Sequence, residues 1–114
     1  MTLSELTRKQ VESILTKYCS ERLPVYLHDQ VRLGFRFRGD SVTLYEERPG
    51  FGKPEIWVET VVAQFRFKPQ TRKWTLYWAD RNSKWHEYDL IGPSRSFETL
   101  LKEVHEDSTG IFWG

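Results

Sequence analysis

The run QVRLGFRFRGDSVTLYEERP, residues 30–49, constrains the fold of this chain more than any other feature. In its first half apolar residues alternate with arginine or glycine, and the apolar ones are Val31, Leu33, Phe35 and Phe37. Because successive side chains of a strand point to opposite faces, this strand has one apolar and one basic face. Gly39 and Asp40 favour a tight type II′ turn, after which residues 42–45 alternate again. The run therefore predicts a β-hairpin with one buried face.

Three later segments carry the same alternation. They are ETVVAQFRFKP (59–69), KWTLYWAD (73–80) and KWHEYDL (84–90). In the first, residues 61, 63, 65 and 67 fall on one face, and Gln64, Arg66 and Lys68 fall on the other. With the alternation in residues 31–38, this predicts that Phe35 and Phe65 are buried while Arg36 and Arg66 are exposed. The segment RPGFGKPE, residues 48–55, is predicted to be a loop because of its proline and glycine content. Five strands in sequence predict an antiparallel meander.

Two amphipathic helices flank the strands. The first begins with Thr7 and Gln10 in capping-box spacing and ends before Pro24. The second has Ser96 as its predicted N-cap, and Gly110 is placed to end it. We therefore predict an α+β fold, a five-stranded antiparallel meander with an N-terminal and a C-terminal helix packed on one face. The predicted core residues of the sheet are Val31, Leu33, Phe35, Phe37, Leu44, Phe65, Phe67, Trp74, Leu76 and Trp78.

Length and composition indicate one self-sufficient domain over residues 1–114. Cys19 is the only cysteine, which excludes an intrachain disulfide and a four-cysteine zinc site. Neither a signal-peptide pattern nor a run of about 18 apolar residues is present, so we expect a cytoplasmic protein without membrane partners. The oligomeric state is left open by the sequence.

The charge of the chain is unevenly distributed. Residues 30–86 contain eleven Lys and Arg against six acidic residues, whereas residues 87–114 contain two against six. This asymmetry fits either a polyanion partner or a sheet whose charge is neutralised by the C-terminal helix.

Three aromatic-rich motifs, in order, give the chain a family likeness. They are VTLYEERP (42–49), WTLYWADRNSKWHEYD (74–89) and TGIFWG (109–114). With them the chain resembles the domain of unknown function 3024 family of small bacterial proteins. The resemblance spans nearly the whole chain and implies a single intact domain. It implies no activity, substrate or catalytic residue.

The basic face of the predicted sheet is the candidate binding site. Its residues are Arg32, Arg36, Arg38, Arg66, Lys68, Tyr45 and Tyr77. Cations beside aromatic rings suit single-stranded nucleic acid, since guanidinium groups neutralise phosphates and rings stack bases of any sequence. The alternative is an ordinary solvent face, on which the arginines stack on tyrosines and pair with Glu46, Glu47 and Glu87. The sequence leaves both interpretations open.

Metal-binding and catalytic signatures are weak. WHEYD and VHED each place a histidine beside two acidic residues, His86 with Glu87 and Asp89, and His105 with Glu106 and Asp107. At this spacing, in a strand and on a helix respectively, the side chains do not point toward one common site. Cys19 lies on the apolar stripe of the first helix, and G-x-S-x-G and phosphate-loop motifs are absent from the sequence. We assign no catalytic residue, metal ligand or cofactor.

The C-terminal tail, Gly110, Ile111, Phe112 and Trp113, is apolar where most chains fray. Burial of its two aromatic rings is worth about 7 to 12 kcal/mol as an upper bound, whereas ordering four residues costs about 6 kcal/mol. We therefore predict that the tail is a structural plug, with a handle for a partner as the alternative. Phe51, between two glycines, is expected to fold back onto the sheet edge, with a partner anchor as the alternative.

Three functional classes follow. The first is a non-enzymatic binding module for single-stranded nucleic acid or another polyanion. The second is a protein-interaction or structural adaptor that uses exposed aromatics, and the third is an enzyme of unrecognised type. Nucleic acid and a protein are the corresponding partners.

Overall fold

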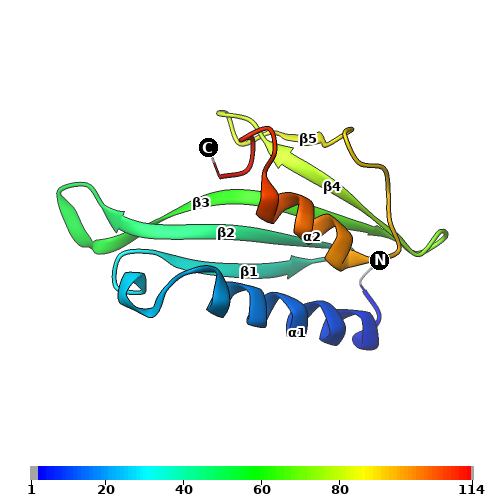
Figure 1. Cartoon of the computed structure of the whole chain (residues 1–114), viewed down its shortest axis with the longest axis horizontal. Helices are drawn as coiled ribbons and strands as arrows, with labels where there is room; N and C mark the ends of the chain where they lie inside the picture. Colours follow the sequence, from blue (N-terminus) through cyan, green and yellow to red (C-terminus); the bar gives the residue numbers. More distant parts are fainter. Residues whose placement is uncertain (1–2, 114) are drawn as a thin grey trace.

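The computed structural model describes residues 3–113 and confirms the predicted α+β meander (Figure 1). Its elements in chain order are α1 (Glu5–Arg22), the short 3-10 helix η1 (Val25–Leu27), β1 (Arg32–Arg38), β2 (Ser41–Gly50), β3 (Lys53–Lys68), β4 (Lys73–Ala79), β5 (Trp85–Glu87) and α2 (Phe97–Glu106). The strands form one sheet in the order β1-β2-β3-β4-β5, and each pairs antiparallel with its neighbour. Among the described residues, no helix combines the length and apolar character needed to cross a membrane.

Both helices pack on the same face of the sheet, and the core lies between them and the strands. The sheet contributes fully buried side chains such as Leu44, Phe65 and Leu76, and the helices contribute Leu15 and Leu100. Aromatic contacts join the layers, for example Phe65 with Phe97 of α2 at 4.5 Å between ring centroids. The opposite face of the sheet carries neither helix, and we call it the open face.

The apolar side chains at the sheet edge are less buried than the period-two alternation of the sequence predicts. Phe35 and Phe37 lie on the helix side but are only half-buried, so the expectation of a buried Phe35 is wrong in degree. Leu33 is half-buried and lies outside the core cluster. The reason is that β1 is an edge strand, which pairs with β2 on one side and, within residues 3–113, has no strand on the other. α1 covers its side chains only in part. Phe67 and Trp78 are likewise half-buried and pack against the core.

The predicted face of Val61 is wrong because β3 contains a β-bulge. Leu44 lies opposite Ala63, but Tyr45 lies opposite Val61, so Val62 is the extra residue. The bulge turns Val61 to the open face, whereas we predicted it beside Ala63 and Phe65. Val62 itself is buried.

The predicted loop at residues 48–55 is largely strand. β2 continues to Gly50 and β3 starts at Lys53, which leaves a turn in which Gly52 adopts a φ of 76°. Pairing with β1 stops at Glu47, so residues 48–58 form a two-stranded extension that we call the β2–β3 arm (Figure 1). Phe51 at its tip is fully exposed and does not fold back onto the sheet. The short turn leaves that ring no surface to pack on.

Two helix ends differ from the prediction. α1 begins one turn early, because Ser4 rather than Thr7 is its N-cap and accepts the Thr7 N–H at 3.2 Å. Ser96 caps α2 as predicted. The left-handed residue that ends α2 is Asp107, with a φ of 45°, and not Gly110.

Asp107 also holds the C-terminal tail. Its carboxylate accepts the backbone N–H groups of Phe112 and Trp113 at 3.0 and 2.9 Å. The Trp113 indole donates to the Val104 carbonyl at 3.0 Å, and the buried Phe112 ring contacts Tyr88 at 5.1 Å between centroids. The tail is therefore packed against the end of α2 and the core.

Candidate site on the open face of the sheet

Strand register places all the predicted binding residues on the open face. One row across the sheet is Arg36, Thr43, Gln64 and Tyr77, and the next is Arg38, Ser41 and Arg66. Lys68 follows on the same face opposite Lys73 of β4. At the other end, Tyr45 lies opposite Gly34, and Arg32 begins β1.

Arginines stack on aromatic rings in three places on this face. Arg32 lies over Trp57 at 3.7 Å, Arg36 over Tyr45 at 5.0 Å, and Arg66 over Tyr77 at 3.8 Å. The predicted arginine–tyrosine stacking is thus present, and Trp57 is an additional partner that the sequence reasoning missed. The bulge at Val62 brings Trp57 to this face, and no local sequence signal marks that bulge.

Tyr45 lies directly across Gly34. A Cβ atom built at position 34 would come within 2.6 Å of the Tyr45 ring. Glycine is therefore required at this point of β1 for the ring to lie flat on the sheet. Burial raises the pKa of Tyr45, and the neighbouring carboxylates Glu47 and Glu59 add to the effect.

In the half of the open face near the β2–β3 arm, Arg36 is paired with a carboxylate. Arg36 donates two hydrogen bonds to Glu59, at 2.6 and 2.5 Å, and these hydrogen bonds hold the pKa of the Glu59 carboxyl below its usual value. The sequence interpretation named Glu46, Glu47 and Glu87 as partners of the arginines, which is wrong for Arg36. Glu46 instead accepts from Arg48 at 2.7 Å.

The other half of the face is basic. Arg38, Arg66, Lys68 and Lys73 occupy its last two rows, and none of them forms an ion pair with another residue in the range 3–113. Gln64 accepts a hydrogen bond from Arg66 Nε at 2.7 Å. We call these four residues the basic end of the face. Lys73 was missed from the sequence, where only its place opposite Lys68 across the β3–β4 turn could have revealed it.

A pocket of about 530 Å³ opens at this basic end. Three cations and two hydroxyl side chains line it together with the Tyr77 ring and one carboxylate. The cations and hydroxyls are Arg66, Lys68, Lys73, Thr71 and Thr75, and the carboxylate is Glu87. The lining is suited to an anion, because cations outnumber the single acid and hydroxyl groups can donate to anion oxygens.

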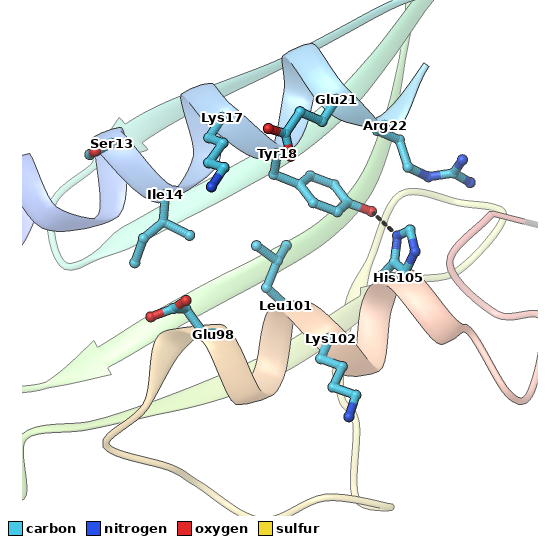
Figure 2. Close-up of a pocket in the computed structure, with 10 residues that line it drawn as sticks. All are labelled: Ser13, Ile14, Lys17, Tyr18, Glu21, Arg22, Glu98, Leu101, Lys102 and His105. Carbon is cyan, nitrogen blue, oxygen red and sulfur yellow. Dashed lines mark hydrogen bonds between the residues drawn. The ribbon is translucent and has the colours of Figure 1, made fainter. Parts of the chain in front are cut away.

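A second groove, of about 560 Å³, separates the two helices (Figure 2). Ile14 and Leu101 face each other across it, and Tyr18 of α1 reaches His105 Nδ1 of α2 at 3.2 Å. Burial raises the pKa of the Tyr18 hydroxyl. The rim mixes lysines with Glu21 and Glu98, so its charge selects neither anions nor cations.

The histidine and cysteine positions do not assemble a metal or nucleophilic centre in the described chain. Residues 3–113 contain no group of three metal-ligating side chains. His86 contacts Asp80 Oδ2 at 2.8 Å and stacks on Trp78, while His105 contacts Tyr18. Burial raises the pKa of the Cys19 thiol to about 11, which disfavours the reactive thiolate at neutral pH.

Comparison with known proteins gives the chain a family. The fold is an α+β meander whose open face ends in a basic pocket, and the family model Domain of unknown function (DUF3024) matches residues 3–114. The chain therefore belongs to the DUF3024 family. Neither a curated protein nor a solved structure matches it.

Proposed function

We propose that this protein binds single-stranded nucleic acid on the open face of its sheet. The observation that carries the proposal is the basic end, where Arg38, Arg66, Lys68 and Lys73 lie in adjacent rows without acidic partners in the described chain. Neighbouring strands are about 5 Å apart, so these cations span a distance comparable with successive phosphates of a nucleic-acid strand.

The aromatic content of the face favours a single strand over a duplex. Bases of a single strand can stack on aromatic rings or on guanidinium planes, and the Arg66 guanidinium, which lies over the Tyr77 ring, offers such a plane. A duplex hides its bases and would use only the cations. Stacking is tolerant of sequence, so the expected binding is weak and without sequence preference.

A protein-interaction role is the second candidate, and it draws on a different region. Phe51 at the tip of the β2–β3 arm is fully exposed, and Ile56 and Val58 are more than half exposed along it. Exposed apolar side chains grouped on a projecting element are typical of a protein contact.

Fluorescence anisotropy with a labelled oligonucleotide tests the first proposal. The affinity should fall steeply with salt. The triple variant Arg66→Gln/Lys68→Gln/Lys73→Gln should flatten the salt slope by about 2, since each lost phosphate contact removes about 0.7. The matched control, Lys9→Gln/Lys17→Gln/Lys102→Gln, removes the same charge from the helices and should leave the slope close to that of the parent.

An internal comparison sharpens this experiment. The pair Arg32→Gln/Arg36→Gln should change the slope less than the pair Lys68→Gln/Lys73→Gln, because Arg36 is already neutralised by Glu59. Absence of binding at low salt, or an equal response to the basic-end and helix variants, would refute the proposal.

A further inference from the structure

Two chain segments border the pocket at the basic end, one through Pro93 and one through Thr71. On its outer side Pro93 belongs to a segment fixed to β4, because Trp74 and Ser94 exchange two backbone hydrogen bonds of 2.7 and 2.9 Å. At its end lies the β3–β4 turn, in which the N–H groups of Thr71 and Arg72 both donate to the Lys68 carbonyl. A nucleic-acid strand that runs along the open face toward the pocket therefore meets these two segments.

The charge of the pocket exceeds what an internal phosphate requires. Its lining carries Arg66, Lys68 and Lys73 against the single carboxylate of Glu87. An internal phosphodiester has one negative charge, whereas a terminal phosphomonoester has about −1.5 to −2 at neutral pH and three acceptor oxygens. The Thr71 and Thr75 hydroxyls supply further donors for those oxygens.

We propose that this pocket holds the terminal phosphate of a nucleic-acid strand, with Arg38 and the rest of the open face contacting internal phosphates. The assignment rests on the proposed function and adds the strand end as the feature that is recognised. In this arrangement the Arg66 guanidinium, which lies over the Tyr77 ring at the pocket, offers a plane on which the terminal base can stack.

The test compares three oligonucleotides of one sequence, with a 5′-phosphate, a 3′-phosphate or hydroxyls at both ends, in anisotropy titrations on the full chain. One of the phosphorylated strands should bind about tenfold more tightly than the hydroxyl strand, since charge-assisted hydrogen bonds are worth at least about 1.4 kcal/mol together. Inorganic phosphate should abolish this preference at concentrations that leave binding of the hydroxyl strand intact.

Variants separate the pocket from the rest of the face. Lys73→Gln and Thr75→Val should reduce the preference for the phosphorylated end, and Thr75→Val does so without a change of charge or branching. Glu87→Gln should increase the preference, because Glu87 is the only carboxylate among the described residues that line the pocket. The control Arg38→Gln should lower the affinity for all three oligonucleotides by the same factor, since Arg38 lies on the open face but outside the pocket.

The outcomes distinguish the two proposals. If all three oligonucleotides bind equally and with strong salt dependence, the pocket assignment is wrong and the proposed function stands. If none of them binds, both are overturned. A preference that survives Lys73→Gln and Thr75→Val together, in variants that melt like the parent, would also overturn the pocket assignment.

Discussion

At the scale of single residues, two aspartates organise the loops that surround them. Asp80 accepts the backbone N–H groups of Asn82 and Lys84 on one oxygen and contacts His86 on the other. Asp107 accepts two backbone N–H groups of the tail. Neither role could be predicted from the sequence, because these acceptors act on residues two to six positions later in loops that have no periodic pattern.

The Asp80 carboxyl provides a prediction about pH. Hydrogen bonds from His86 and from the backbone of Lys84 and Asn82 lower its pKa from 3.8 to about 2. The charged form is favoured by folding, so its contribution to stability is complete above pH 3.8 and is lost as the pH falls through about 2. A ¹³C NMR titration of the Asp80 carboxyl should therefore give a midpoint near 2.

His86→Ala should raise that midpoint toward 3.8, because the hydrogen bond from His86 is the largest cause of the shift. Lys84→Ala keeps the backbone donor and serves as the control, with an expected midpoint unchanged from the parent. A midpoint near 3.8 in the parent would show that the Asp80–His86 contact does not form in solution.

At the scale of elements, the strand periods predicted the meander and its two faces, and the caps and turns were predicted less well. The alternation of Arg36 with Phe35 and Phe37 determines which face of β1 is apolar. The two faces of this strand were therefore predicted correctly. The bulge at Val62 and the strand character of residues 48–55 were missed. At residues 48–55 tertiary pairing overrides local preference, since β2 and β3 pair through a segment whose prolines and glycines favour a loop. At Val62 the local sequence carries no signal for the bulge, which shows only in the register between β2 and β3.

The packed tail gives a prediction about stability. Removal of residues 111–114 should lower the free energy of unfolding by at least about 3 kcal/mol and the melting temperature by roughly 10 °C, because a buried phenylalanine is lost together with its contact to Tyr88. Thermal unfolding followed by circular dichroism measures the change.

Phe51→Ser is the matched control for the truncation. It also removes an aromatic ring, but one that is fully exposed, so the melting temperature should stay within about 2 °C of the parent. A truncated chain that melts like the parent would mean that the tail is not a structural plug, and loss of a bound partner from that chain would favour the handle alternative.

At the scale of the whole molecule, the helices and the basic end lie on opposite faces of one sheet. The sequence located every predicted binding residue on the correct face, because that assignment needs only the period of two. It did not show that the face is divided, with Arg36 neutralised by Glu59 at one end and Lys68 beside Lys73 at the other. That division depends on the pairing register between neighbouring strands, which cannot be predicted from the sequence of any one strand.

The β2–β3 arm has a consequence for how the molecule opens. In the described chain β3 pairs with β4 only from Gln64 to Lys68, so residues 53–60 have a single neighbouring strand. A two-stranded ribbon is marginally stable in water, so the arm can separate while the rest of the sheet stays intact. Amide protons of residues 55–58 should exchange with deuterated solvent far sooner than those of Val42 and Leu44, whose strand is paired on both sides beneath the helices.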